Sequence, residues 1–126
     1  MREYWQNNLI GKTLNEDYPR KFSLCDIDGL IRMGYYLNKV NYQRLIIYES
    51  KFENERPMKK PQLDSLKMLY NSIDWSKFDK YSGLFVLKVS TDEGKISNIK
   101  WYDLNYKFIR NTSMDEFYNL ISNPTP

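Results

Sequence analysis

One stretch of the chain combines residue types that could do chemistry, residues 45–51, LIIYESK. Four apolar or aromatic residues lead directly into a carboxylate and an ammonium. Side chains alternate between the two faces of a strand. One face of this stretch would carry Leu45, Ile47, Glu49 and Lys51. Burying such charges is costly unless they are paired or bind a metal, so the stretch predicts a polar site at the end of a buried strand.

A second acidic cluster lies upstream in residues 22–33, FSLCDIDGLIRM, which we interpret as a strand that residues 35–37 extend. Asp26 and Asp28 would share one face of it. An Asn-rich turn at 38–41 would pair it with the strand at 43–52, so that an Asp, Glu49 and Lys51 converge. The dipeptide Asp28-Gly29 also favours a hairpin turn, and in that alternative residues 29–37 form a separate strand.

Convergent carboxylates suggest metal chemistry. Two carboxylates and a backbone carbonyl suit Mg²⁺, which prefers oxygen ligands. Such an ion activates a bound water and stabilises negative charge that grows on a phosphate. A lysine beside that water would orient or deprotonate it. The alternative is an ordinary ion pair between Glu49 and Lys51, worth about 0–1 kcal/mol if exposed.

The composition limits the other kinds of chemistry. The chain has 126 residues, 41% of them hydrophobic, which suits one domain spanning 1–126. It has no histidine and a single cysteine, Cys25. This excludes catalysis by Ser-His-Asp or Cys-His groups, His-ligated zinc, Cys-based zinc sites and intramolecular disulfides. The net charge of +3 is compatible with an anionic partner without requiring one.

The remaining patterns predict an α+β or mixed α/β fold with a mixed four-stranded sheet and the element order αββαββα. Residues 2–15 indicate a weakly amphipathic helix. The spacing of Leu63, Leu66, Leu69 and Ile73 predicts a second helix, with Pro61 at its first turn. Residues 84–90 and 96–104 are typical of strands joined by the turn TDEGK. A start signal at Ser113 predicts a last helix over 113–122.

These residues carry a resemblance to a known superfamily. Asp28, then Glu49-Ser50-Lys51 at the end of an apolar strand, then a helix that opens with Gln62, resemble the PD-(D/E)xK (restriction-endonuclease-like) nucleases. The phrases DIDGLI and LIIYESK are similar to the resolvase-like and nuclease-related-domain branches. The resemblance covers roughly residues 1–104. It departs from the family motif at Ile27, where a literal match would have proline.

The resemblance implies roles for individual residues. Asp28 and Glu49 would bind the metal with the backbone carbonyl of Ser50, and Lys51 would be the catalytic lysine. Gln62 would match a polar residue of the site, although it could equally only cap its helix. The possible further acidic ligands are Glu3, with Glu16 in reserve, and Asp26.

Two other sets of residues bear on this reading. Lys59 and Lys60 would contact phosphates, or else belong to a solvated loop. A second E-x-K match, Glu93-Gly94-Lys95, follows no apolar run directly, and we interpret it as a solvated turn.

The resemblance also implies a function. The expected activity is Mg²⁺-dependent hydrolysis of DNA, with Mn²⁺ able to substitute and RNA as an alternative substrate. A Holliday-junction-resolvase-like endonuclease of this kind would act as a homodimer in repair or recombination, or in a virus or mobile element. No apolar run is long enough to span a bilayer and no signal-peptide core is evident, so we expect a cytoplasmic protein without a membrane partner. The alternative is a non-catalytic nucleic-acid-binding or assembly module on the same fold.

Overall fold

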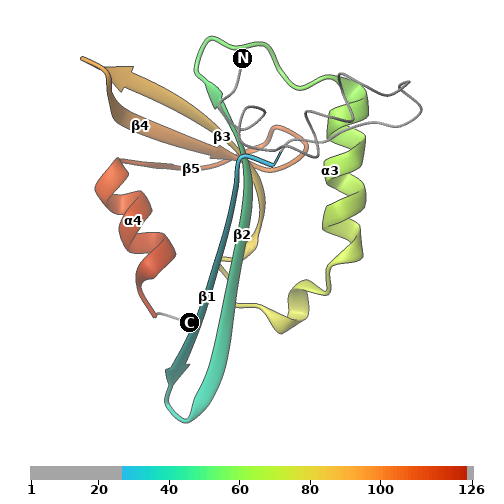
Figure 1. The fold of residues 1–126 in the computed structure, drawn as a ribbon, viewed down its shortest axis with the longest axis vertical. Helices are drawn as coiled ribbons and strands as arrows, with labels where there is room; N and C mark the ends of the chain where they lie inside the picture. Colours follow the sequence, from blue (N-terminus) through green and yellow to red (C-terminus); the bar gives the residue numbers. More distant parts are fainter. Residues whose placement is uncertain (1–26, 125–126) are drawn as a thin grey trace, which may run out of the picture.

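The computed structural model describes residues 27–124, which form an α+β fold around one mixed sheet (Figure 1). The sheet has five strands in the order β1-β2-β3-β4-β5. Only β2 and β3 run parallel, and the other neighbours are antiparallel. The strands are β1 (Gly29–Leu37), β2 (Val40–Phe52), β3 (Gly83–Asp92), β4 (Lys95–Tyr102) and β5 (Phe108–Thr112). The helices are α3 (Lys60–Ser72), the short 3₁₀ helix η1 (Trp75–Lys77) and α4 (Met114–Ser122).

The hairpin between β1 and β2 turns at Asn38 and Lys39, as the sequence predicts. Both residues have positive φ, 52° and 66°, which is the backbone of a two-residue turn that matches the twist of the strands. The register pairs Leu37 with Val40 and Gly29 with Tyr48. The start of β1 therefore lies beside the end of β2.

The parallel pair β2 and β3 requires a crossover, because parallel neighbours cannot be joined by a tight turn. Residues 53–59, α3 and η1 provide it. Pro61 lies in the first turn of α3, where its missing N–H costs no helical hydrogen bond. The predicted helix and its proline are thus confirmed.

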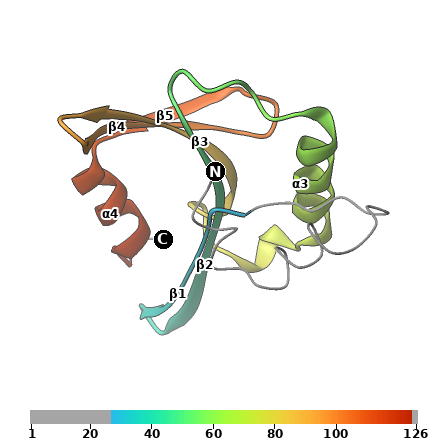
Figure 2. The same ribbon diagram turned by 45° about the horizontal axis from the view of Figure 1, so that its top comes forward.

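The two long helices pack on opposite faces of the sheet, as Figure 2 also shows. We name these faces after the helices. The α3 face buries Ile47, Leu66, Leu84, Val86 and Leu104 in one core. The α4 face buries Ile46, Leu87, Ile99, Trp101 and Phe117 in a second core. Successive side chains of β2 thus pack into the two cores in turn, which explains the near-continuous apolar run in its sequence.

The helix α4 begins with a capping box. The Ser113 side chain accepts a hydrogen bond from the Glu116 backbone N–H at 3.1 Å, and the Glu116 carboxylate accepts one from the Ser113 N–H at 2.9 Å. Two backbone donors that the helix itself leaves without acceptors are satisfied in this way. The start signal at Ser113 is confirmed.

The sequence prediction of four strands is wrong, because residues 108–112 form a fifth strand, β5. It has five residues and lies at the edge of the sheet, where alternate burial is weak. Phe108 and Ile109 are exposed, at 54% and 38% of their surface, so the strand lacks the hydrophobic alternation that the sequence reading used. The mixed sheet and the α+β class are confirmed.

The strand predicted from residue 22 begins, in the described part, at Gly29. Ile27 and Asp28 precede it without regular structure. The expected helix at 2–15 and residues 22–26 lie outside the described residues. No helix among residues 27–124 is long and apolar enough to cross a bilayer.

Candidate active site

The end of β2 carries the first two candidate residues on the α3 face. Glu49 is fully buried, with none of its surface exposed, and lies opposite Val86 of β3. Lys51 is two residues further along the same face and is half-buried. The carboxylate therefore lies at the boundary between the apolar core and the more open end of the sheet. Its burial makes its charge sensitive to any cation beside it.

Asp28 is held against the same triplet. Its Oδ2 accepts hydrogen bonds from the Ser50 backbone N–H at 2.7 Å and from the Ser50 hydroxyl at 2.9 Å. Because Gly29 is paired with Tyr48, Asp28 lies beside Glu49 and Ser50. The structure thus brings together the start of β1 and the Glu49-Ser50-Lys51 end of β2. The chain reversal between β1 and β2 occurs at Asn38 and Lys39, and Asp28-Gly29 takes no part in it.

Tyr48 is a neighbour of this site that the sequence reading missed. A Cβ on Gly29 would overlap the Tyr48 ring, so the ring occupies the space that any larger residue at position 29 would need. Burial raises the pKa of Tyr48 above its ordinary value, and the carboxylate of Asp28 raises it further. Tyr48 also meets Phe117 of α4 edge to face at 6.3 Å between ring centres. Only the pairing of β1 with β2 reveals this role.

Gln62 lies in the first turn of α3 and is half-buried. The next residue, Leu63, packs on the core that contains Ile47 and Val86. The first turn of α3 therefore lies over the strands that hold Glu49. A role for Gln62 in the site stays a prediction.

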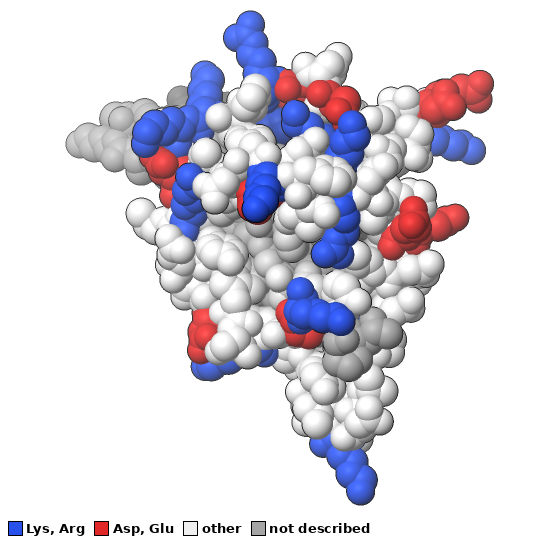
Figure 3. Space-filling model, turned by 180° about the vertical axis from the view of Figure 1, so that it is seen from behind, with Lys and Arg blue, Asp and Glu red and all other residues white. Residues whose placement is uncertain are grey.

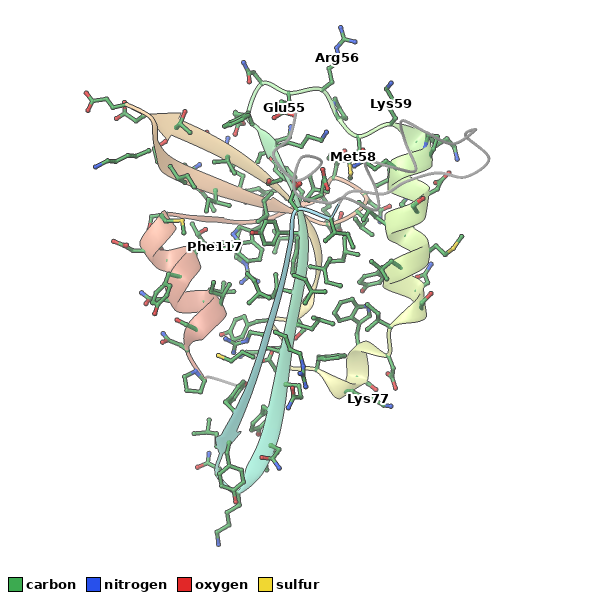
Figure 4. The ribbon with its side chains drawn as sticks, viewed as in Figure 1. Glu55, Arg56, Met58, Lys59, Lys77 and Phe117 are labelled. Carbon is green, nitrogen blue, oxygen red and sulfur yellow. The ribbon has the colours of Figure 1, made fainter. Side chains whose placement is uncertain are left out.

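Lys59 and Lys60 are both exposed. Figure 4 shows Arg56 and Lys59 projecting outward from the connection between β2 and α3, while Met58 points inward. Lys60 forms an ion pair with Asp64 at 2.9 Å, with 84% and 54% of the two side chains exposed. This pair lies four residues apart on the helix surface and contributes little to stability.

The second E-x-K match has the surroundings that its sequence predicts. Glu93 and Gly94 form the turn between β3 and β4, with φ of 51° and 79°. Glu93, Gly94 and Lys95 are all exposed. The same three-residue pattern thus occurs once against a buried core and once in solvent.

The oxygen atoms near Asp28 are suited to bind a hard cation, since carboxylate and carbonyl oxygens are the ligands that Mg²⁺ prefers. The hydrogen bonds that Asp28 accepts from Ser50 orient its carboxylate through Oδ2. Within residues 27–124, no group of three or more His, Cys, Asp or Glu is arranged to bind a metal. A site here would consist of Asp28, Glu49 and a backbone oxygen, and the candidates Glu3, Glu16 and Asp26 lie outside the described residues.

Comparison of the chain with protein-family models, with curated proteins and with solved structures gives no match.

Proposed function

We propose that this protein is a metal-dependent nuclease that hydrolyses phosphodiester bonds in DNA. The observation that carries the proposal is the hydrogen bonding of Asp28 to Ser50, at the centre of the Glu49-Ser50-Lys51 triplet. Two carboxylates on adjoining strand ends, with a lysine on the same face, match the roles that phosphodiester hydrolysis needs. The resemblance to PD-(D/E)xK nucleases agrees with this assignment and adds the expectation of a restriction-endonuclease-like fold.

Each residue has a distinct task in the proposed reaction. Asp28 and Glu49, with the Ser50 carbonyl, would hold Mg²⁺ or Mn²⁺. When bound, the metal would activate water and stabilise charge on the phosphate. Lys51 would orient the attacking water and add positive charge beside the transition state. Ser50 would keep the Asp28 carboxylate in place through its N–H and hydroxyl.

A second candidate function follows from the burial of Glu49. A carboxylate shielded by a folded core is compatible with a protein that binds nucleic acid, or assembles with partners, without cutting. In that case the acidic residues only support the fold. The expected homodimer, cytoplasmic location and preference for junctions or ends belong to the nuclease proposal.

A cleavage assay tests the proposal. Single-stranded, duplex, flap and four-way-junction DNA are incubated with the protein in Mg²⁺, Mn²⁺ or EDTA. The site variants are Asp28→Asn, Glu49→Gln and Lys51→Met. The amide side chains keep the shape of the native carboxylates, and an asparagine at position 28 can still accept hydrogen bonds from Ser50. These changes therefore remove charge with little change in packing.

The second E-x-K match provides matched controls, because Glu93→Gln and Lys95→Met make the same chemical changes in an exposed turn. We expect metal-dependent cleavage that falls at least about 100-fold in each site variant, the order of effect of losing one catalytic group. The controls should cut like the original protein. Equal activity in site and control variants, or no cutting of any substrate by folded protein, contradicts the nuclease proposal.

A further inference from the structure

Three lysines form a row across the α3 face, next to the candidate active site. Lys51 of β2 is paired with Lys88 of β3, and Lys88 is paired with Lys100 of β4. Directly paired residues of neighbouring strands point to the same face of a sheet. Because neighbouring strands lie about 4.8 Å apart, the row spans roughly 10 Å. We name Lys51, Lys88 and Lys100 the lysine row.

Such an arrangement is unfavourable for the fold alone, because like charges directly opposite one another on paired strands destabilise a sheet. The repulsion among the three lysines is only partly offset by other contacts. Lys100 forms an ion pair with Glu53 at 3.2 Å, with 38% and 43% of the two side chains exposed. The Lys88 ammonium lies 5.4 Å from the centre of the Tyr102 ring. Both contacts hold the ammonium groups in place without adding more than one negative charge.

The carboxylate of Glu53 shows that an anion can lie beside Lys100. This carboxylate reaches across β3, accepting from the Ser90 hydroxyl at 3.3 Å and from Lys100 on the next strand. An anion on the outer side of the row is therefore already accommodated in the structure. A phosphate oxygen and a carboxylate oxygen accept the same charge-assisted hydrogen bonds from lysine.

The surface of the molecule is not uniformly basic (Figure 3). Figure 3 shows Lys and Arg side chains gathered on the upper half of one face, with Asp and Glu side chains among them. The net charge of the whole chain is only +3. Attraction of a polyanion would therefore depend on the local arrangement of lysines more than on the overall charge.

We propose that the lysine row binds the phosphodiester backbone of a nucleic-acid strand and leads that strand to Asp28 and Glu49. Lys88 and Lys100 contact phosphates that do not react, while Lys51 lies at the end of the row next to the carboxylates. The direction toward a cleaved phosphate rests on the proposed nuclease function. Backbone binding by Lys88 and Lys100 does not depend on cleavage.

Binding is measured by fluorescence anisotropy with labelled single-stranded and duplex DNA, in EDTA to prevent cutting, at several salt concentrations. The test variants are Lys88→Gln and Lys100→Gln. Lys77→Gln is the matched control, because Lys77 is an exposed lysine on η1, at the opposite end of α3 from Lys59 (Figure 4). Melting curves of every variant check that the fold is retained.

Each lost phosphate contact should reduce the slope of log K against log salt by about 0.7 for single strands or 0.9 for duplex. This corresponds to about five- to eightfold weaker binding at 0.1 M salt. Glu53→Gln should change affinity in the opposite direction, because it removes the carboxylate that competes with phosphate for Lys100. Asp115→Asn on α4, on the other side of the sheet, controls for the loss of one negative charge.

The outcomes separate this proposal from the nuclease proposal. If Lys88→Gln and Lys100→Gln bind DNA with the affinity and salt slope of Lys77→Gln, the lysine row is not a backbone site, whether or not the protein cuts. If Lys88→Gln and Lys100→Gln bind DNA more weakly but the original protein cuts no substrate, binding by the lysine row is supported and the nuclease proposal is contradicted. Tighter binding by Glu53→Gln but not by Asp115→Asn supports the row, and equal effects of the two contradict it.

Discussion

A buried ion pair on the α4 face gives the sharpest prediction about stability. Arg44 of β2 has no exposed side-chain surface, and its Nε donates to Asp79 Oδ2 at 2.8 Å, where the Asp79 side chain is 2% exposed. One of its terminal nitrogens also donates to the carbonyls of Leu120 at 2.7 Å and Asn123 at 2.8 Å. One guanidinium thus joins β2, the segment before β3 and the last turn of α4, where carbonyls lack helical donors.

Asp79→Asn removes the negative charge and leaves the Arg44 cation buried. Removing one partner of a buried pair costs about 3–5 kcal/mol, because the other charge keeps its desolvation penalty. Two features lower the cost here. The two carbonyls still accept from Arg44, and the guanidinium lies 4.9 Å from the centre of the Tyr81 ring. We therefore expect about 3 kcal/mol, at the lower end of that range.

Arg44→Met should cost more, about 4–5 kcal/mol, because it removes the donor of the two carbonyls as well as the partner of Asp79. Combining Arg44→Met with Asp79→Asn removes both charges together. The double variant should be more stable than the sum of the two single changes predicts, by about 1–3 kcal/mol, since residues in direct contact are not additive.

Urea denaturation followed by circular dichroism measures these free energies of unfolding, and a double-mutant cycle gives the coupling. The control is the exposed pair Lys60 and Asp64, which has nearly the same separation of 2.9 Å. Asp64→Asn should change stability by less than about 1 kcal/mol. If Asp79→Asn costs no more than Asp64→Asn, or if the coupling between Arg44 and Asp79 is zero, this buried pair does not stabilise the fold as proposed.

Three further changes test local features. Lys39→Gly should stabilise the protein by about 0.5–1 kcal/mol in thermal melts, because glycine accepts the positive φ of the hairpin turn, whereas Lys39→Ala should not stabilise it. Gly29→Ala should cost about 1–3 kcal/mol by displacing the Tyr48 ring, and the cost should shrink in a Tyr48→Ala background, where no ring is displaced. The raised pKa of Tyr48 means that the folded state holds this proton more tightly than the unfolded state. The stabilisation that comes from this raised pKa is complete below the unfolded pKa of about 10 and is lost as the pH rises through the folded pKa. The stability of the original protein above pH 10 should therefore fall more steeply than that of Tyr48→Phe.

Much of the fold could be predicted from local patterns. β2, α3, β3, β4 and α4 each carry a strong period or a start signal, and all five were predicted within three residues of their observed ends. The strand β5 could not be predicted in this way, because its residues become a strand through pairing with β4. An edge strand needs no strong hydrophobic alternation of its own.

The candidate site could be predicted in part for the same reason. Alternation in β2 and a short turn were enough to place Asp28 beside the Glu49-Ser50-Lys51 end of β2. The pairing of Arg44 with Asp79 joins residues that are 35 positions apart and depends on how the crossover packs. The lysine row requires the register between the parallel strands β2 and β3, which no local pattern specifies.

The two signs of charge on the α3 face constrain what this surface can bind. Asp28 and Glu49 would repel a phosphate, whereas Lys88 and Lys100 attract it, and Lys51 lies between the two groups. A nucleic acid that follows the lysine row would therefore bind most tightly if a cation lies beside Asp28 and Glu49, because the cation would cancel their repulsion of the phosphate. The same arrangement without a cation would hold the backbone away from the carboxylates. The change from negative to positive charge along one face would thus couple the proposed metal site to strand binding. Neither the net charge of +3 nor the E-x-K pattern alone shows this arrangement.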